Sequence, residues 1–214
     1  MSERAIVICL RAMLPTVVGA FLVAIAMLAA RDTDRALHGA AAILAALYLT
    51  WILAEARITV QPPSQRASET STLLPYALSR SATGLSAVLW PLPWNDWSWW
   101  MILPFGGFAA AVALRLWAIR ILGRFYSHHV VRYSYHAIVS TGPYKYVRHP
   151  AYTGMLLAHA FFVAFFANLL SVLFLVVLMG CVLRRILVEE QALWPVPGYP
   201  AYAHERARLI PGVW

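Results

Sequence analysis

The chain has 214 residues, of which 61% are hydrophobic and only 12% are charged, and its formal net charge is +8. Soluble domains carry about 25% charged residues, so this composition excludes an ordinary soluble domain and indicates a protein built for lipid. The basic residues are spread over connectors rather than gathered in an arm or groove, so we expect membrane lipids, and no nucleic acid, as partners.

Five segments, taken in chain order, are apolar enough to be read as membrane spans. They are Met13–Ala30, Leu37–Ala56, Trp99–Ile119, Tyr152–Ala167 and Leu169–Leu187. We therefore expect an all-α integral membrane protein with about five transmembrane helices. The last two segments are joined only at Asn168, which predicts a C-terminal helical hairpin with a first arm that is short for a full crossing.

A shorter apolar patch, Leu85–Leu92, is interrupted by Pro91 and followed by several tryptophans. It is too short to span, and tryptophan collects at membrane–water interfaces, so we expect this stretch to lie at the interface. The chain then divides into two parts. Residues 1–120 form N-terminal helices, with three spans and this interfacial segment, and residues 121–214 form a core that carries the chemistry.

Lys and Arg placement predicts the orientation, since cytoplasmic loops carry an excess of both. With five spans, most basic residues fall in the connectors that share a side with the C-terminus. We therefore expect the N-terminus outside and the C-terminus in the cytoplasm. The composition, rich in Arg and Ala with a single Lys, suggests a GC-rich bacterial genome and hence a bacterial inner membrane.

Three polar blocks lie next to the last apolar segments. The first is Gly123–His129, the second runs from His136 to Tyr152, and the third is Arg185–Leu193. Because the two arms of the hairpin are antiparallel, the start of one and the end of the other share a face. His149 and Glu189 are thus brought together, and ionisable groups this close to hydrocarbon are candidates for function.

The chemistry of these blocks suits a cofactor that carries a sulfonium group. The amino-acid carboxylate of such a cofactor can bind at a helix start, where the helix dipole favours anions. Its cationic groups need a carboxylate or aromatic faces, which Glu189, Tyr144 and Tyr152 can supply. The apolar pair Ile138–Val139 suits an adenine ring. The histidines match no zinc spacing and no cysteine accompanies them, so we expect no metal site.

The blocks read Tyr-Ser-His, then His-x-x-Val-x-x-Gly-x-Tyr-x-x-x-Arg-His-Pro-x-Tyr-x-Gly, then Arg-x-x-x-Glu-Glu-x-x-Leu. In this they resemble the isoprenylcysteine carboxyl methyltransferase family of integral membrane methyltransferases. The resemblance implies S-adenosyl-L-methionine as the cofactor, bound in a loop and helix region on the cytoplasmic side. It places cofactor contacts on His129, His136, Ala137, Ile138, Val139, Tyr144, His149, Pro150, Ala151, Tyr152 and Glu189.

The predicted catalytic group is Arg185, Glu189 and Glu190. The resemblance implies that Arg185 contacts the substrate, and Glu190 or His149 is the candidate base if the acceptor is an amine. Tyr199 and Tyr202 correspond to substrate-binding tyrosines only if about two residues are missing before them. The stretch Trp194–Pro197 departs from the family pattern, which leaves the shape of the C-terminal lid and the substrate open.

The favoured reaction is methyl transfer to a lipophilic acceptor, as carboxyl methylation of an isoprenylcysteine-like or isoprenoid carboxylate on a small molecule or a lipidated protein. One alternative is a phospholipid N-methyltransferase of the phosphatidylethanolamine type. Others are an NADPH enzyme related to sterol reductases, against which Arg148-His149-Pro150 with Glu189-Glu190 argues, and a non-enzymatic transporter or scaffold.

Arg185 and Glu189 could also be a structural ion pair at a helix end. Arg before Glu is the less favourable order in a helix, and Glu at a helix C-terminus opposes the dipole, so the functional interpretation is preferred.

Overall fold

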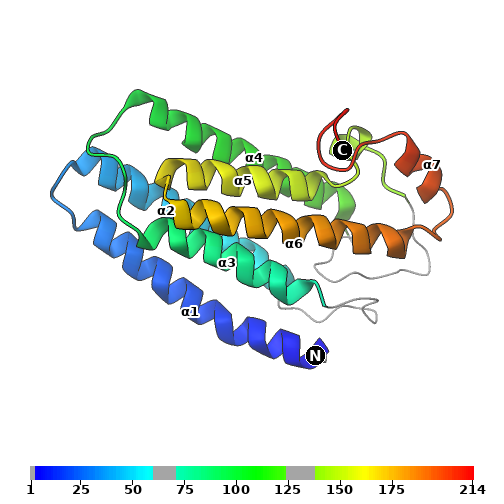
Figure 1. The fold of residues 1–214 in the computed structure, drawn as a ribbon, viewed down its shortest axis with the longest axis horizontal. Coiled ribbons are helices and arrows are strands. Elements are labelled where there is room, and N and C mark those ends of the chain that lie inside the picture. The colour runs from blue at the N-terminus through cyan, green and yellow to red at the C-terminus, as the bar shows by residue number, and fades with distance from the viewer. Residues whose placement is uncertain (1–2, 60–70, 124–137) are drawn as a thin grey trace.

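The protein is described by a computed structural model that covers residues 3–59, 71–123 and 138–214. Within these ranges the chain is all-helical, with one isolated parallel bridge between Val147 and Ala207. The α-helices are α1 (Glu3–Ala29), α2 (Arg35–Thr59), α3 (Leu73–Leu89), α4 (Ile102–Leu122), α5 (Pro150–Phe166), α6 (Leu169–Leu193) and α7 (Tyr199–His204). Two short 3₁₀ helices, η1 (Trp99–Met101) and η3 (Gly142–Lys145), precede α4 and α5. Figure 1 shows the long helices side by side in one bundle.

Four helical stretches in the described residues are long and apolar enough to cross a membrane. They are Ala5–Ala29, Arg35–Glu55, Trp99–Leu122 and Leu169–Leu193. The predicted integral membrane class is therefore confirmed, and these stretches contain most of four predicted spans. The segment predicted at Tyr152–Ala167 is the helix α5, whose 17 residues are apolar but short, as expected. The predicted count of five spans is not confirmed.

The helix α3 was not predicted. The sequence reading placed only Leu85–Leu92 near the membrane surface, whereas Leu73–Leu89 forms a continuous helix that packs against α6 and α1. Small and polar residues interrupt its apolar pattern, among them Ser79, Arg80 and Thr83, and all three are buried inside the bundle. Helix packing, rather than lipid exposure, therefore explains why its composition is less apolar than that of its neighbours.

Because α3 belongs to the bundle, both termini lie at the same end of it (Figure 1). Successive helices from α1 to α6 run in opposite directions along the bundle. The connectors after α2 and α4 therefore join helix ends on the side of the termini. The connectors after α1, α3 and α5 lie at the opposite end. We expected the N-terminus and C-terminus on opposite sides of the membrane, whereas the structure, with α3 in the bundle, places them at one end of it; the orientation in the membrane stays a prediction.

The predicted hairpin between α5 and α6 is present, and its turn is tightly held. Ala167 adopts a left-handed conformation with φ 40°, and Asn168 begins α6 by accepting a hydrogen bond from the Ser171 amide at 2.9 Å. The Asn168 side-chain amide also donates to the carbonyl of Ala87 on α3. The hairpin therefore places the start of α5 and the end of α6 at the end of the bundle where both termini lie.

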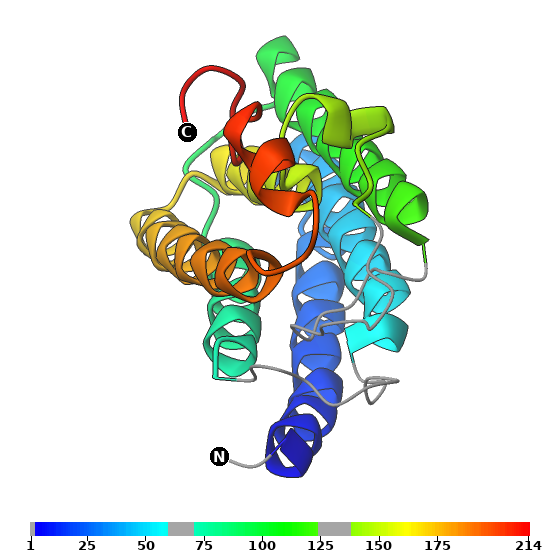
Figure 2. The same cartoon turned by 90° about the vertical axis from the view of Figure 1, so that its right-hand side faces the viewer.

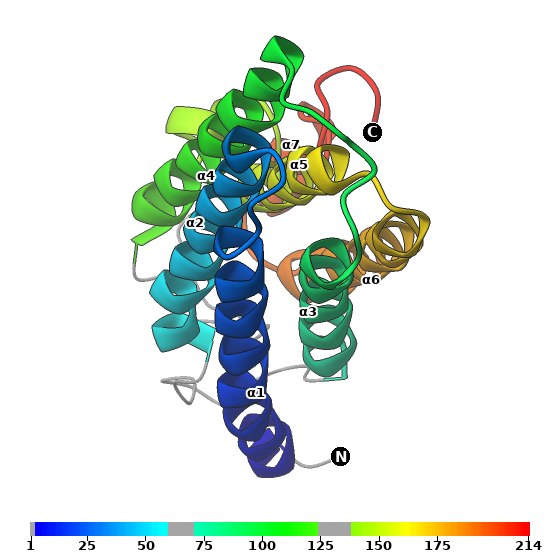
Figure 3. The ribbon, with the colours of Figure 1, turned by 90° about the vertical axis from the view of Figure 1, so that its left-hand side faces the viewer.

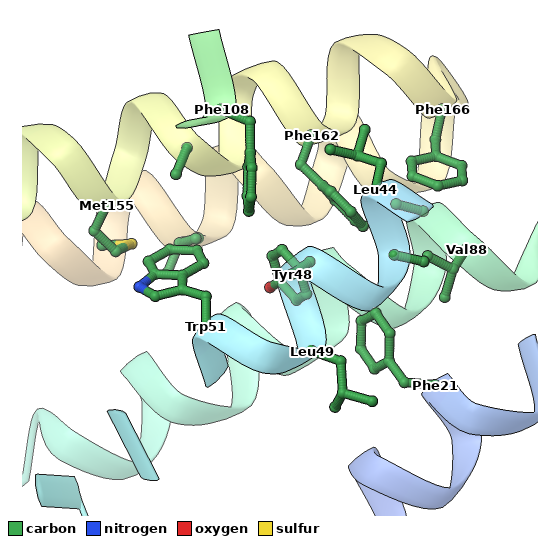
Figure 4. Packing of buried hydrophobic residues seen from close by; sticks show 14 of the residues in the cluster. Phe21, Leu44, Tyr48, Leu49, Trp51, Val88, Phe108, Met155, Phe162 and Phe166 are labelled. Carbon is green, nitrogen blue, oxygen red and sulfur yellow. The ribbon is translucent and has the colours of Figure 1, made fainter. Parts of the chain in front are cut away.

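Aromatic side chains fill the centre of the bundle (Figure 4). Tyr48 on α2 stacks against Phe21 of α1 at 5.3 Å and Phe162 of α5 at 4.2 Å between ring centroids. Its hydroxyl lies 2.9 Å from Nε2 of the buried His159. Seen end-on in Figure 3, α1, α2 and α4 form one row and α3, α6 and α5 lie beside it. The core thus joins the N-terminal helices to the hairpin that carries the predicted site.

Candidate functional site

A glycine turn leads the chain into α5. Gly142 has φ 58°, a backbone conformation that L side chains rarely adopt, and it opens the short helix η3, in which Tyr144 is buried. Pro150 then occupies the first turn of α5, where its missing N–H leaves no bond unmade. Because His149 is the residue just before this turn, its side chain is fixed at the entrance of the helix.

Gly154 permits α5 to approach α4 closely. A Cβ atom at this position would lie 2.7 Å from the Ala111 carbonyl oxygen and 2.8 Å from the Arg115 nitrogen, which is too close for any side chain. The close approach lets the buried Arg115 donate a hydrogen bond from Nη1 to the Ala151 carbonyl at 2.9 Å. The glycine in the motif therefore sets the position of the first turn of α5.

Glu190, near the end of α6, is buried and faces three cationic or ionisable groups. Its Oε1 lies 2.9 Å from Arg148 Nη1 and 3.1 Å from His149 Nε2, and its Oε2 accepts from Arg208 Nε at 2.9 Å. For the His149 contact to be a hydrogen bond from a neutral ring, the ring proton must sit on Nε2. Glu190 therefore ties the start of α5 and the C-terminal tail to the end of α6.

Glu189 takes part in a second, adjoining group. Tyr152 donates its hydroxyl to Glu189 Oε1 at 2.6 Å, and Arg185 Nε donates to the Tyr152 oxygen at 2.6 Å. Arg185 Nε also lies 3.5 Å from Glu189 Oε1, and His149 Nδ1 lies 3.8 Å from Oε2. Arg185 is only 1% exposed, and its Nη1 donates to Thr72, the residue just before α3. His149 therefore lies between the two glutamates.

The chain beyond α6 folds back over this region (Figure 2). The Arg148 and His149 amides donate to the carbonyls of Ala207 and Arg208 at 2.9 and 3.0 Å. Tyr202 on α7 donates its hydroxyl to the Tyr144 carbonyl at 2.9 Å. We call residues 194–214 the lid. These contacts hold the lid against η3 and the start of α5.

Burial raises the pKa of Tyr199 and also that of Tyr202, which reaches about 12, so both phenols stay protonated at neutral pH. The Tyr199 hydroxyl and Arg148 Nε are buried, and neither has a hydrogen-bond partner among the residues that the structure describes. Such donors are costly to bury and indicate a polar ligand or water.

The structure brings together most of the residues predicted for the site. Those that lie at the junction of η3, α5, α6 and the lid are Tyr144, His149, Pro150, Ala151, Tyr152, Arg185, Glu189, Glu190, Tyr199 and Tyr202. The predicted apolar pair is divided, since Val139 packs near Tyr144 and Ile138 packs against the lid. His129, His136 and Ala137 lie outside the described residues.

Four contributors were missed. Arg148 and Arg208 were not predicted as partners of Glu190. Thr72 and Tyr76 were not predicted to contact Arg185, whose guanidinium carbon lies 5.6 Å from the centre of the Tyr76 ring. The position of Arg148 beside His149 was a usable signal. The other three residues gave no signal in the sequence. Arg208 reaches Glu190 only because the lid folds back, and Thr72 and Tyr76 reach Arg185 only because α3 forms, which the apolar pattern did not indicate.

Part of the chain matches a known protein family. Residues 102–195 match the model of the isoprenylcysteine carboxyl methyltransferase family. A search of curated proteins gave no match. The matched range runs from the start of α4 to just beyond the end of α6, so it contains the closely packed α4 and α5 together with both glutamates. This match covers less than half of the chain and supports an isoprenylcysteine carboxyl methyltransferase-like assignment for these residues, and that family is one of methyltransferases.

Proposed function

We propose that the chain transfers a methyl group from S-adenosyl-L-methionine to a lipophilic acceptor in the membrane. The proposed reaction is carboxyl methylation of an isoprenylcysteine-like or isoprenoid carboxylate. The observation that carries the proposal is the meeting of His149 and Tyr152 at the start of α5 with Glu189 at the end of α6, beside the buried Arg185. The family match over the same helices supports it.

The residues present fit the charges of this cofactor, which has an ammonium, a sulfonium and a carboxylate group. Glu189 and the neighbouring Tyr152 suit the cationic groups, because carboxylates and aromatic faces both attract them. Arg148 Nε and the Tyr199 hydroxyl are buried donors without a partner among the described residues, and they suit the carboxylate. The proposed cofactor contacts are therefore those of the α5 start, the end of α6 and the lid.

The mechanism needs alignment more than acid–base chemistry. When bound, the cofactor supplies an electrophilic methyl group on its sulfonium sulfur. An acceptor carboxylate is already ionised at neutral pH, so it needs no general base. Arg185 would hold that carboxylate by charge-assisted hydrogen bonds, and Tyr152 and Thr72 fix the direction of its guanidinium. The lid would exclude water from the reacting groups.

The test is a methyl-transfer assay with tritiated S-adenosyl-L-methionine and the purified full-length chain in detergent. An isoprenyl-cysteine analogue, an isoprenoid acid and total membrane lipids serve as acceptors. We expect labelled product from which mild base releases methanol, since a methyl ester is hydrolysed by base. Product that keeps its label in base would contradict carboxyl methylation and favour phospholipid N-methylation. Binding of the cofactor with no product from any acceptor would contradict the acceptor class.

We further propose that the end of the bundle with both termini faces the cytoplasm. Among the Lys and Arg residues in the described ranges, only Arg31, in the connector after α1, and Arg35, at the start of α2, lie at the opposite end, where Asp32, Asp34 and Asp96 also lie. This distribution follows the positive-inside rule with both termini inside. Fusion of green fluorescent protein to each terminus in turn should give fluorescence from both, whereas an alkaline phosphatase fusion active at either terminus would contradict the orientation.

A further inference from the structure

Three charged residues meet inside the bundle, outside the site described above. Glu55 on α2, Arg80 on α3 and Arg115 on α4 are 2%, 8% and 1% exposed. Glu55 and Arg80 precede the range that matches the family. One carboxylate facing two guanidinium groups leaves one positive charge in excess among these three residues. A charge buried without compensation is expensive in an apolar interior.

The Glu55 carboxylate is shared unequally between the two arginines. Arg115 binds it side-on, with Nε 2.5 Å from Oε1 and Nη2 2.8 Å from Oε2. Arg80 reaches it only through Nη1, at 2.8 Å from Oε2. Trp51 Nε1 donates to Oε1 as well, at 2.5 Å. Glu55 therefore makes more hydrogen bonds with Arg115 than with Arg80. Arg115 in turn donates a hydrogen bond to the Ala151 carbonyl.

One edge of the Arg80 guanidinium, the edge that can donate two parallel hydrogen bonds, makes no hydrogen bond within the described residues. Its Nε and Nη2, which lie on the same side of the planar guanidinium, are buried and have no hydrogen-bond partner in the described part of the chain. The Trp51 ring covers one face of the group, 4.4 Å from the guanidinium carbon to the ring centre, which fixes its plane. Two parallel N–H groups on a fixed plane match the two oxygens of a carboxylate.

The position of Arg80 connects this edge to the candidate site. Thr72, which caps the start of α3, and Tyr76 and Arg80 within it are spaced four residues apart, so they lie along one face of the helix. The first two contact Arg185, and Arg80 follows about 6 Å further along the helix. The aromatic cluster of Figure 4, to which Trp51 belongs, adjoins the group. A ligand that reaches Arg80 must therefore be apolar apart from its acidic group.

We propose that the Nε–Nη2 edge of Arg80 is a binding site for the carboxylate of a lipophilic acid. Phosphate shares the same chemistry, so an anionic phospholipid is the competing source of the oxyanion. This site is distinct from Arg185, which holds the acceptor carboxylate in the proposed function. The binding site itself does not depend on that function.

The experiment measures binding of tritiated farnesoic acid, and of farnesol as the matched uncharged ligand, to the full-length chain in detergent without S-adenosyl-L-methionine. We expect the acid to bind at least about tenfold more tightly than the alcohol, as is usual for hydrogen bonds to a charged group. Arg80→Gln should lower the affinity for the acid to that for the alcohol and leave the alcohol unchanged. Arg80→Lys keeps the positive charge but not the two parallel N–H groups, so its affinity for the acid should lie between those of the unaltered chain and Arg80→Gln. Arg184→Gln, an exposed arginine on α6, is the control.

Equal affinity for acid and alcohol in the unaltered chain would overturn the proposal, as would an Arg80→Gln variant that binds the acid normally. Parallel loss of both ligands would show a structural role only. If Arg80→Gln does not fold, the proposal is tested by comparing the ratio of acid affinity to alcohol affinity in the unaltered chain and in Arg80→Lys. Displacement of the acid by an equal concentration of phosphatidylglycerol would overturn the carboxylate assignment.

Discussion

The two ends of the helix bundle are closed in different ways. At the end with the tryptophans, single side chains hold the connectors. Asp34 accepts hydrogen bonds from the amides of Leu37 and Trp97, Trp94 donates to the Phe165 carbonyl, and Asn168 caps α6. At the end with the termini, two glutamates bind three arginines, His149 and the Tyr152 hydroxyl. Among the described residues, this second end gathers more buried ionisable groups than closing a bundle requires.

This difference indicates that the tryptophan end serves as structural scaffold, whereas the end with the termini holds the candidate site. Caps and indole hydrogen bonds satisfy groups that every helix end leaves open, so they need no ligand to explain them. A cluster such as Glu190 with Arg148, His149 and Arg208 brings charge out of water, at a cost that is often not recovered in stability. We therefore expect substitutions at the site end to affect ligand binding and turnover, and those at the tryptophan end to affect stability alone.

The largest effect is expected for Glu190→Gln. Without its charge, Arg148, His149 and Arg208 lose their shared partner in a buried position. Breaking a buried ion pair on one side costs about 3–5 kcal/mol, so the melting temperature in detergent should fall clearly and methyl transfer should be lost. Glu205→Gln is the control, because Glu205 pairs with Arg206 at 71% side-chain exposure, where such a pair contributes about 0–1 kcal/mol. Equal melting temperatures for the two variants would contradict the distinction.

Arg185→Ala should separate turnover from cofactor binding. Arg185 is buried and lies between Tyr152 and Thr72, and its loss should lower the rate of methyl transfer by about 10²-fold, as for other groups that orient a reacting oxyanion. The binding of S-adenosyl-L-methionine, measured by calorimetry, should change much less. Arg184→Ala removes the same charge from an exposed neighbour and should keep full turnover. Unchanged turnover in Arg185→Ala would remove its proposed role.

Gly154→Ala tests whether the close approach of α4 and α5 sets the site. A methyl group there would meet the Ala111 carbonyl and the Arg115 backbone, and such overpacking costs about 1–3 kcal/mol. We expect a lower melting temperature and weaker cofactor binding, because Ala151 and Tyr152 would shift with the first turn. Gly180→Ala on α6 has nothing within 4 Å of its added Cβ, so it should be neutral or slightly stabilising. Matching behaviour of the two variants would contradict the packing argument.

The sequence predicted those parts of the fold and the site that depend on local pattern. Long apolar runs indicated α1, α2, α4 and α6, and the antiparallel hairpin predicted that His149 and Glu189 would meet. The helix α3 escaped because Ser79, Arg80 and Thr83 face the inside of a bundle, where neighbouring helices rather than lipid surround them. The expected placement of the two termini depended on the same omission. Arg208 escaped because its place depends on a fold-back of the chain that no local pattern specifies.

The smallest effect is expected at the tryptophan end, from Asp34→Asn. Asp34 has φ 37°, a conformation that Asn tolerates, so the change mainly replaces one carboxylate oxygen with a donor. Hydrogen bonds from the backbone N–H groups of Leu37 and Trp97 lower the pKa of Asp34 below its ordinary value of 3.8. The stabilisation is therefore complete above that value and is lost as the pH falls through the lowered pKa. The variant should melt slightly below the unaltered chain at neutral pH and approach it in acid, with turnover unchanged. Asp32→Asn, in an exposed pair with Arg35, should show no such dependence. A fall in turnover with Asp34→Asn would mean that the two ends are coupled, and the division into scaffold and site would fail.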